Sequence, residues 1–219
     1  LYKIFLHILR SLKNFFFFKN KIKSHKISND LDYLIVSHFL NINQTGKDTD
    51  FYFGKIPDII KSFNKKVAIA LINHTPYSSN MVLSRWKKKP RVPRIVFGKS
   101  INILFELSIL VKLIKNFFKV DSFIKQKNND FEKKVSQELK KNLFSIDTVN
   151  NLKIAHQIKY LVKLYKPKKI ILIHEGHAHE RIIFKSAREI NSNIKCIGYQ
   201  HACIFRLQHS LKRNLNKGY

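Results

Sequence analysis

The side chains best suited to chemistry lie in two short polar segments near the carboxyl end of the chain. The first segment, HEGHAHER, supplies His174, Glu175, His177, His179, Glu180 and Arg181. The second, GYQH, ends in Tyr199, Gln200 and His201. A carboxylate beside imidazoles is a suitable setting for deprotonating a sugar hydroxyl, because partial burial moves the pKa of a Glu or His toward neutrality. Glu175 is therefore the candidate for the general base or for orienting the acceptor, and His201 and His38 are the alternatives.

The same segments are less well suited to a metal. A zinc-protease helix needs a second His four residues after the first, and the residue four after His174 is Ala178. His177 and His179 could still ligate as a pair, with Glu175 or Glu180 completing the set, but no distant second group of ligands is recognised. The chain also has no G-x-S-x-G elbow, no G-x-G-x-x-G and no Walker sequence. We therefore expect neither a metal nor a bound cofactor.

The elements around these segments form a βαβ unit. The apolar run 170–174, bounded by Pro167 and Gly176, predicts a buried parallel strand. Apolar residues at helical spacing follow over 182–190, and a second apolar run over 194–199 predicts the next strand. Both polar segments then lie at the carboxyl ends of their strands, where open α/β sheets place their ligand sites.

We expect further side chains to shape a substrate site around the base. They are His177, Glu180, Arg181, Tyr199, Gln200 and His74. Glu180 has a second interpretation, because a carboxylate in the first turn of a helix caps free N–H groups and meets the positive end of the helix dipole. Tyr199 and Gln200 supply hydrogen-bonding groups suited to a polyhydroxylated ligand.

The first half of the chain repeats this organisation. The run 32–39 predicts a strand that ends in Ser37-His38, and the run 66–72 predicts one that is followed by Asn73-His74. A helix beginning at Pro57 joins the two strands. A lone histidine is more often structural than functional, but the matched positions of His38 and His74 at strand ends favour a functional role.

The remaining segments complete one predicted α/β domain. Residues 94–97 predict a third short strand, and 101–120 predict a buried helix, with a helix at a membrane surface as the alternative. A further helix over 151–165 carries one apolar stripe, made of Ile154, Ile158, Leu161, Val162 and Tyr165. No linker interrupts 30–205, so a single α/β domain with a parallel sheet flanked by helices is expected.

Composition points to an anionic partner. Lys and Arg number 42 against 14 Asp and Glu, which gives a net charge of +28. Nucleic acid, a lipid surface and phosphorylated substrates all fit this charge, as does a compositional bias on a solvated surface. Residues 1–29 form a basic amphipathic segment that either lies at an anionic membrane or packs on the domain. No recognisable nucleic-acid motif is present, so nucleic acid is not the expected partner.

Cysteine usage and hydropathy bear on location. The two cysteines, Cys196 and Cys203, are too few for a disulfide framework, which fits a reducing cytoplasm. No charge-free run approaches the roughly 20 residues needed to span a bilayer. We therefore expect a cytoplasmic protein with peripheral contact to the inner membrane. Because the chain begins with Leu1 and stops at Tyr219 without a closing element, we expect it to be a fragment.

The segment IHEGHAHERIIF, followed by IGYQHACIFRLQHSL, resembles the surface carbohydrate biosynthesis proteins, a glycosyltransferase-like family of bacterial polysaccharide and lipopolysaccharide assembly. The stretches LIVSHFLNINQTGKDTDFYFGKIPDII and VAIALINHT resemble the first half of that family, so the resemblance covers about 30–215. The sequence departs from the family pattern at His177 and His179, where relatives often have Gln and an aromatic residue.

The resemblance implies a GT-B architecture, in which two Rossmann-like domains face a cleft. Residues 30–206 would be the acceptor-side domain, and 207–219 would start the linker to a donor domain. The implied reaction is transfer of a sugar from a nucleotide-sugar to a polysaccharide or lipid-linked acceptor. A nucleotide-sugar epimerase or hydrolase on the same fold, and a basic nucleic-acid-binding module, remain as alternatives.

Overall fold

The computed structural model describes residues 22–86, 89–99, 101–125 and 129–200, together with Leu6 and Leu9. The candidate base His201, most of the segment 1–29 and all of 207–219 lie outside the described residues. The chain divides into two compact units. The helical unit includes Lys99–Lys153, and the sheet unit includes Ile22–Gly98 and the residues from Ile154 onward. The sequence pattern, which predicts one domain over 30–206, does not predict this division.

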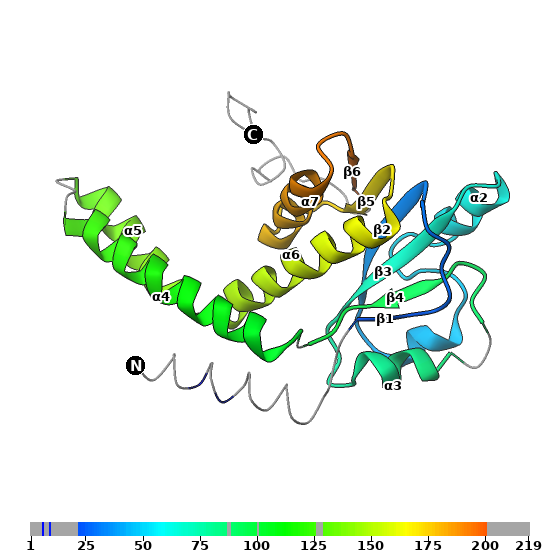
Figure 1. The fold of residues 1–219 in the computed structure, drawn as a ribbon, viewed down its shortest axis with the longest axis horizontal. Helices are drawn as coiled ribbons and strands as arrows, with labels where there is room; N and C mark the ends of the chain where they lie inside the picture. Colours follow the sequence, from blue (N-terminus) through cyan, green and yellow to red (C-terminus); the bar gives the residue numbers. More distant parts are fainter. Residues whose placement is uncertain are drawn as a thin grey trace. The chain divides into compact units, whose positions relative to one another are not determined.

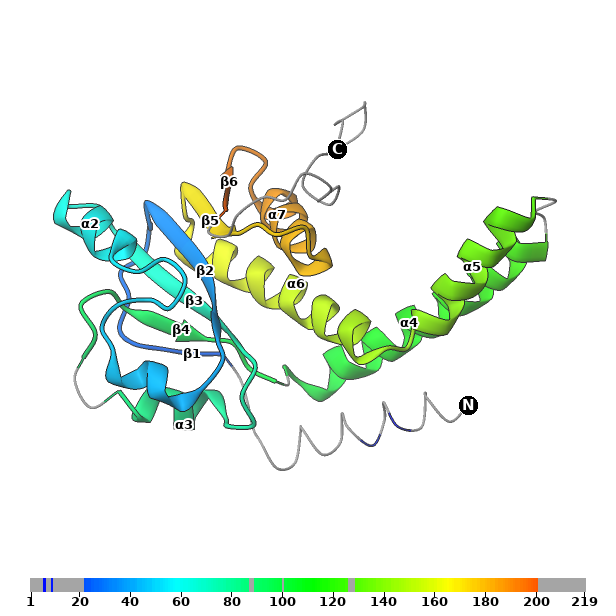
Figure 2. The same cartoon turned by 180° about the vertical axis from the view of Figure 1, so that it is seen from behind.

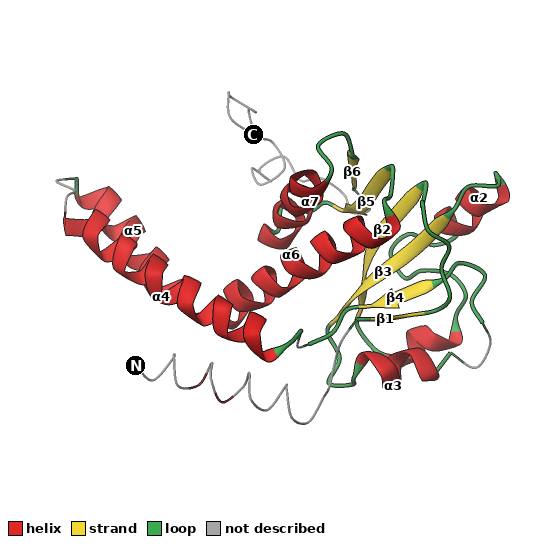
Figure 3. Cartoon of the chain, in the orientation of Figure 1, coloured by secondary structure: helices red, strands yellow, loops and turns green. Residues whose placement is uncertain are grey.

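The sheet unit is built on a six-stranded sheet with the order β1-β4-β3-β2-β5-β6 (Figure 1, Figure 3). Its strands are β1 Lys23–Ser24, β2 Tyr33–Phe39, β3 Val67–Asn73, β4 Arg94–Val96, β5 Lys169–Ile173 and β6 Lys195–Tyr199. β1 pairs antiparallel with β4, and every other pair is parallel. The predicted α/β class is confirmed as a Rossmann-like sheet flanked by helices, while the short β1 was not predicted.

One face of the sheet is covered by α6 (Ile146–Tyr165) and α7 (Ala178–Ile190). Residues of β2 alternate between the two faces, so Leu34 and Val36 join the core beneath these helices. The apolar stripe predicted for the helix ending at Tyr165 is confirmed, because all of its members are buried in this core. From α7, Ile183 and Ala187 complete the packing.

The opposite face, seen from behind in Figure 2, is covered by α2 (Ile56–Ser62), α3 (Ser79–Ser84) and the loop after β2. Ile35 and Phe39 of β2 point to this side and are fully buried. Pro57 lies in the first turn of α2, as predicted. Proline is tolerated there because backbone N–H groups of the first turn have no acceptor within the helix, so the absence of one costs no hydrogen bond. Burial on both faces explains why the strands read as nearly continuous apolar runs.

The helical unit contains α4 (Ile103–Lys125), α5 (Asp130–Asn142) and the first turns of α6. Its core is small and includes Ile109, Leu113, Leu143 and Val149. The prediction of a buried helix over 101–120 is therefore wrong in one respect: the helix exists, but only one side of it is buried. Apolar density along a sequence indicates a helix without showing how much of it a neighbour covers. None of the described helices has an apolar run long enough to cross a bilayer.

A buried ion pair lies within the helical unit. The Nζ atom of Lys153 is 2.8 Å from Oε1 of Glu106, and the two side chains are 7% and 3% exposed. Lys153 also donates to the carbonyl of Lys99 at 3.2 Å. The pair therefore ties α4, the start of α6 and the chain entering α4 together through one ammonium group.

We predict that Glu106→Ala lowers the free energy of unfolding of the helical unit by about 3–5 kcal/mol, because the mutation removes the carboxylate from a buried ammonium. Urea unfolding followed by circular dichroism measures the change. Glu138→Ala is the matched control, since its ion pair with Lys141 is exposed and contributes at most about 1 kcal/mol. Equal losses in the two variants would show that burial of the Glu106 pair does not matter.

Candidate functional site

The candidate residues lie at the carboxyl edge of the sheet, where β2 and β5 are neighbours. These strands pair in parallel, with Val36 opposite Leu172. From β2 the chain continues outward to β3, and from β5 it continues outward to β6 on the other side. In Rossmann-like sheets this reversal of strand order opens a crevice beyond the strand ends, and ligands bind there. His38, the penultimate residue of β2, and Glu175, just after β5, both lie at this reversal of strand order.

The loop after β5 is held in place by Glu180. This carboxylate is in the first turn of α7 and only 1% exposed. Its two oxygens accept hydrogen bonds from the backbone N–H groups of Glu175 and Gly176, both at 2.8 Å. Gly176 has a φ of 92°, which favours glycine. The carboxylate of Glu180 thus binds backbone N–H groups, but they belong to the loop before α7 and not, as the capping interpretation expected, to the helix itself. Its oxygens lie on the loop rather than on a ligand.

Four histidines gather beyond the strand ends, and we call His38, His74, His177 and His179 the histidine cluster. Nδ1 of His38 is 2.8 Å from Nε2 of His74, which directly follows β3. The ring of His179 meets that of His38 edge-on, with 5.3 Å between centroids, and stacks on His177 at 5.4 Å. The sequence pointed to His38 and His74 separately from the HEGHAHER segment, and the structure brings them together.

Burial keeps the inner histidines neutral. It lowers the pKa of His38 to about 3, with added repulsion from the other three histidines of the cluster. Burial also lowers the pKa of His74 and of His179. A group with so low a pKa is a weak proton acceptor at neutral pH. His38 is therefore better suited to hydrogen bonding with a substrate than to the general-base role given as an alternative.

Glu175 and His177 occupy the outer side of the cluster. Oε2 of Glu175 is 3.5 Å from Nε2 of His177, and the side chains are 29% and 61% exposed. The negative charge of Glu175 adds to burial in raising the pKa of Tyr52, whose ring meets His38 edge-on at 5.6 Å. Glu175 is thus both accessible and next to the cluster, as a general base must be. Sequence patterns did not point to Tyr52.

The other predicted site residues are placed less directly. The ring of Tyr199 lies 5.0 Å from that of Phe53 and packs against the core, so much of it is used in folding. Gln200 follows β6 directly, and Arg181 lies in the first turn of α7 with Nη2 3.5 Å from the carbonyl oxygen of Gly176. His174 packs on Phe184 and is not part of the cluster.

Gly198 allows β6 to lie close to the end of β5. A Cβ atom at this position would come within 2.8 Å of Cβ of His174. The backbone N–H of His174 donates to the carbonyl of Tyr199 at 3.0 Å, which joins the two strand ends. The glycine in GYQH therefore serves strand packing, and the close approach sets where Tyr199 and Gln200 emerge.

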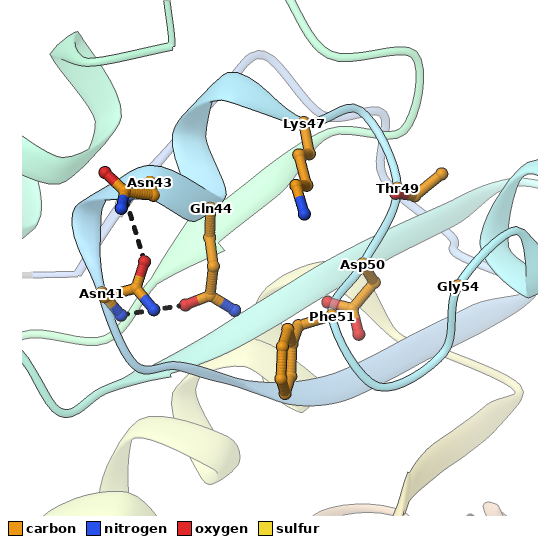
Figure 4. Close-up of a pocket in the computed structure, with 8 residues that line it drawn as sticks. All are labelled: Asn41, Asn43, Gln44, Lys47, Thr49, Asp50, Phe51 and Gly54. Carbon is orange, nitrogen blue, oxygen red and sulfur yellow. Dashed lines mark hydrogen bonds between the residues drawn. The ribbon is translucent and has the colours of Figure 1, made fainter.

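A polar pocket of about 510 Å³ lies in the loop that follows β2 (Figure 4). It is lined by Asn41, Asn43, Gln44, Lys47, Thr49, Asp50, Phe51 and Gly54. Phe51 is 63% exposed, and its ring contacts Tyr52 edge-on at 4.9 Å. Lys47 extends toward the space bordered by Gln44 and Asp50 (Figure 4). Tyr52 also contacts His38, so the ring of Tyr52 lies between Phe51 of the pocket and the histidine cluster.

The pocket is shaped by local hydrogen bonds. Asn41 caps the short 3-10 helix η1 (Ile42–Gly46), and Oε1 of Gln44 accepts from the N–H of Asn41 at 3.1 Å. Asp50, 7% exposed, accepts from the Ser37 hydroxyl at 2.8 Å and from the N–H groups of Tyr52 and Phe53 at 3.0 Å. These bonds fix the turn that presents Phe51. Sequence patterns did not point to this pocket, although Asn41, Asn43 and Gln44 so soon after a strand are the signal that could have found it.

The described residues do not include a group of three or more His, Cys, Asp or Glu side chains arranged to hold a metal ion. Instead, His38 and His74 form a hydrogen bond with each other. The rings of His177 and His179 stack. Comparison with family models, with curated proteins and with solved structures found no match for the chain. Its chemistry therefore has to be argued from its own residues.

We predict that Glu180→Gln lowers the free energy of unfolding by about 2 kcal/mol, because one of its two charge-assisted acceptors becomes an N–H₂ donor facing a backbone N–H. Urea unfolding measures the loss. The control is Glu189→Gln on the same helix, where a half-exposed carboxylate pairs with Lys159 and contributes little. If the two variants unfold alike, Glu180 does not hold the loop.

The lowered pKa of His38 predicts acid sensitivity. The unfolded chain binds a proton at His38 below pH 6.5, and the folded chain does so only near pH 3. The free energy of unfolding therefore decreases as the pH is lowered from 6.5 to 3. We expect His38→Gln to flatten the dependence of unfolding free energy on pH between 7.5 and 5, by at most about 1.4 kcal/mol per pH unit. His177→Gln, at an exposed position, is the control. An unchanged slope in His38→Gln would contradict the prediction.

Proposed function

We propose that the chain is the acceptor-side domain of a GT-B-type glycosyltransferase, which moves a sugar from a nucleotide-sugar to a polysaccharide or lipid-linked acceptor at the cytoplasmic face of the membrane. The observation that carries the proposal is the position of Glu175 and the histidine cluster at the reversal of strand order, next to a polar pocket with an exposed aromatic ring. The resemblance of HEGHAHER and GYQH to surface carbohydrate biosynthesis proteins points the same way.

The pocket has the chemistry of a saccharide site. Asn43 and Lys47 offer hydrogen-bonding groups to hydroxyls, and the exposed ring of Phe51 offers an apolar face to the C–H groups of a sugar. Its volume lies in the range of small-molecule sites, where a few placed polar groups fix the orientation of the ligand. We assign the pocket to a sugar of the acceptor, which places the acceptor's reactive hydroxyl toward Tyr52 and the histidine cluster.

In this reaction the acceptor hydroxyl oxygen attacks the anomeric carbon of the donor, and the bond from that carbon to the nucleotide's phosphate oxygen breaks. Glu175 takes the hydroxyl proton as the new bond forms. His177, 3.5 Å from Glu175, orients the carboxylate. The neutral His38–His74 pair holds the acceptor by hydrogen bonds without adding a charge.

The loop after β5 also argues for an acceptor rather than a nucleotide on this sheet. In dinucleotide-binding folds the N–H groups at such a loop and helix start bind the ligand's phosphates. Here the carboxylate of Glu180 already occupies the N–H groups of Glu175 and Gly176. A phosphate would meet a negative charge at this position. The donor's phosphates are therefore assigned to a separate domain, as in the GT-B arrangement.

The test is a sugar-transfer assay on the full-length protein with a panel of nucleotide-sugars and a lipid-linked oligosaccharide acceptor. Glu175→Gln is expected to lower kcat by about 10²–10⁴-fold, the usual contribution of a general base. Phe51→Ala is expected to raise the KM for the acceptor about tenfold with little change in kcat, because it removes ground-state binding.

Glu189→Gln, far along α7 from the loop, is the activity control. Wild-type turnover in Glu175→Gln would remove Glu175 from the catalytic role. Release of free sugar from the donor at equal rates with and without acceptor would instead identify a nucleotide-sugar hydrolase on the same fold. A change of sugar configuration with no transfer would identify an epimerase.

A further inference from the structure

One side of α4 carries an apolar stripe that faces solvent. It consists of Leu104, Leu107, Val111 and Phe118, which are 76%, 52%, 53% and 64% exposed. Their spacings of three, four and seven residues place them along one line on the helix. The side of α4 that packs in the helical unit is a different one, because Ile109 and Leu113 are 3% and 1% exposed. The helix thus has two apolar sides, and the small core of its unit uses one.

A row of lysines runs beside this stripe. Lys112, Lys115 and Lys119 follow one another at spacings of three and four residues, all on exposed positions of α4. The acidic residues of the helix do not neutralise them, because Glu106 pairs with Lys153 and Asp121 pairs with Lys140. On a helical wheel of 100° per residue the lysines occupy the sector next to the apolar stripe.

The neighbouring helix α5 repeats the exposure. Phe131, Val135 and Leu139 are 73%, 52% and 53% exposed and lie four residues apart. Scattered exposed apolar residues are ordinary, but stripes of large ones on both helices of one small unit mark an interaction surface.

We propose that the helical unit binds the surface of an anionic lipid bilayer, with α4 lying in the interface. The stripe of Leu104, Leu107, Val111 and Phe118 would enter the boundary between headgroups and acyl chains. The lysines beside it would meet the headgroup phosphates. A helix with one apolar side bordered by basic residues is the usual form of an interfacial helix. Each lysine near such a surface adds favourable electrostatic energy.

The charge pattern favours this partner over two others. A second copy of the chain packed stripe to stripe in the antiparallel direction would bring two rows of lysines together, and like charges repel. Nucleic acid would use the lysines but would leave most of a row of four apolar side chains in water, since most of its contacts with proteins are to phosphates and sugars. The proposal does not depend on the proposed function, because it concerns residues outside the sheet unit.

The test is flotation of the purified chain with vesicles of phosphatidylcholine alone and of phosphatidylcholine mixed with phosphatidylglycerol. We expect binding to the mixed vesicles and little binding to phosphatidylcholine alone. The double variant Leu107→Ser/Phe118→Ser is expected to weaken partitioning to mixed vesicles by at least about tenfold. Replacing Lys112, Lys115 and Lys119 with Gln is expected to weaken it about a hundredfold and to reduce its salt dependence.

The matched control is Ile59→Ser, which removes a 53% exposed apolar side chain from α2 in the sheet unit and is expected to change nothing. A second variant, Leu107→Trp, reports insertion directly through a blue shift of its emission when mixed vesicles are added. Wild-type partitioning of the α4 variants, or no blue shift, would overturn the proposal. So would loss of vesicle binding with retained, salt-sensitive binding to DNA, which would assign the charge to nucleic acid.

Discussion

Backbone pairing between β2 and β5 joins Tyr33 to Lys169, which are 136 residues apart in the chain. The histidine cluster depends on this pairing, because it places the end of β2 beside the loop that carries Glu175. The free-energy cost of closing so long a loop grows only slowly with its length. The segment between the paired strands can therefore hold β3, β4 and a separate helical unit without weakening the centre of the sheet.

Burial and charge give the residues at the strand ends different roles. The carboxylate of Glu180 accepts hydrogen bonds from two backbone N–H groups and is buried. Burial lowers the pKa of His38 and of His74, so both are neutral hydrogen-bonding groups at neutral pH. Among the described residues, Glu175 combines a carboxylate with access to solvent beside the cluster. In a chain with a net charge of +28, the described basic side chains at the candidate site include Arg181 at the loop after β5 and Lys47 at the pocket. The inner histidines are neutral, which suits a polyhydroxylated ligand.

Local sequence patterns predicted the helices and strands better than they predicted which of these elements contact one another. Buried parallel strands such as β3 read as apolar runs, and the stripe ending at Tyr165 reads as a helix face, because burial acts directly on neighbouring residues in the sequence. Packing between distant segments decides which strands pair. The contact between His38 and His179 could therefore not be predicted from the sequence. The short β1 has two residues and leaves no pattern to detect. The apolar residues of α4 predicted the helix correctly. The exposure of its side chains depends on the neighbouring elements that cover the helix, which the sequence does not show.

The position of the basic residues bears on what the high charge is for. Phosphate binding at the sheet would use the backbone N–H groups of the loop after β5, but the buried carboxylate of Glu180 occupies two of these groups, beside Arg181. Lys47 lies at the pocket after β2, and a single cation there suits orientation of a ligand more than bulk attraction. Lysines in regular spacing are instead found on α4, beside exposed Leu and Phe side chains. Charge next to apolar surface gains most where a partner offers anions above an apolar interior, and a bilayer is such a partner.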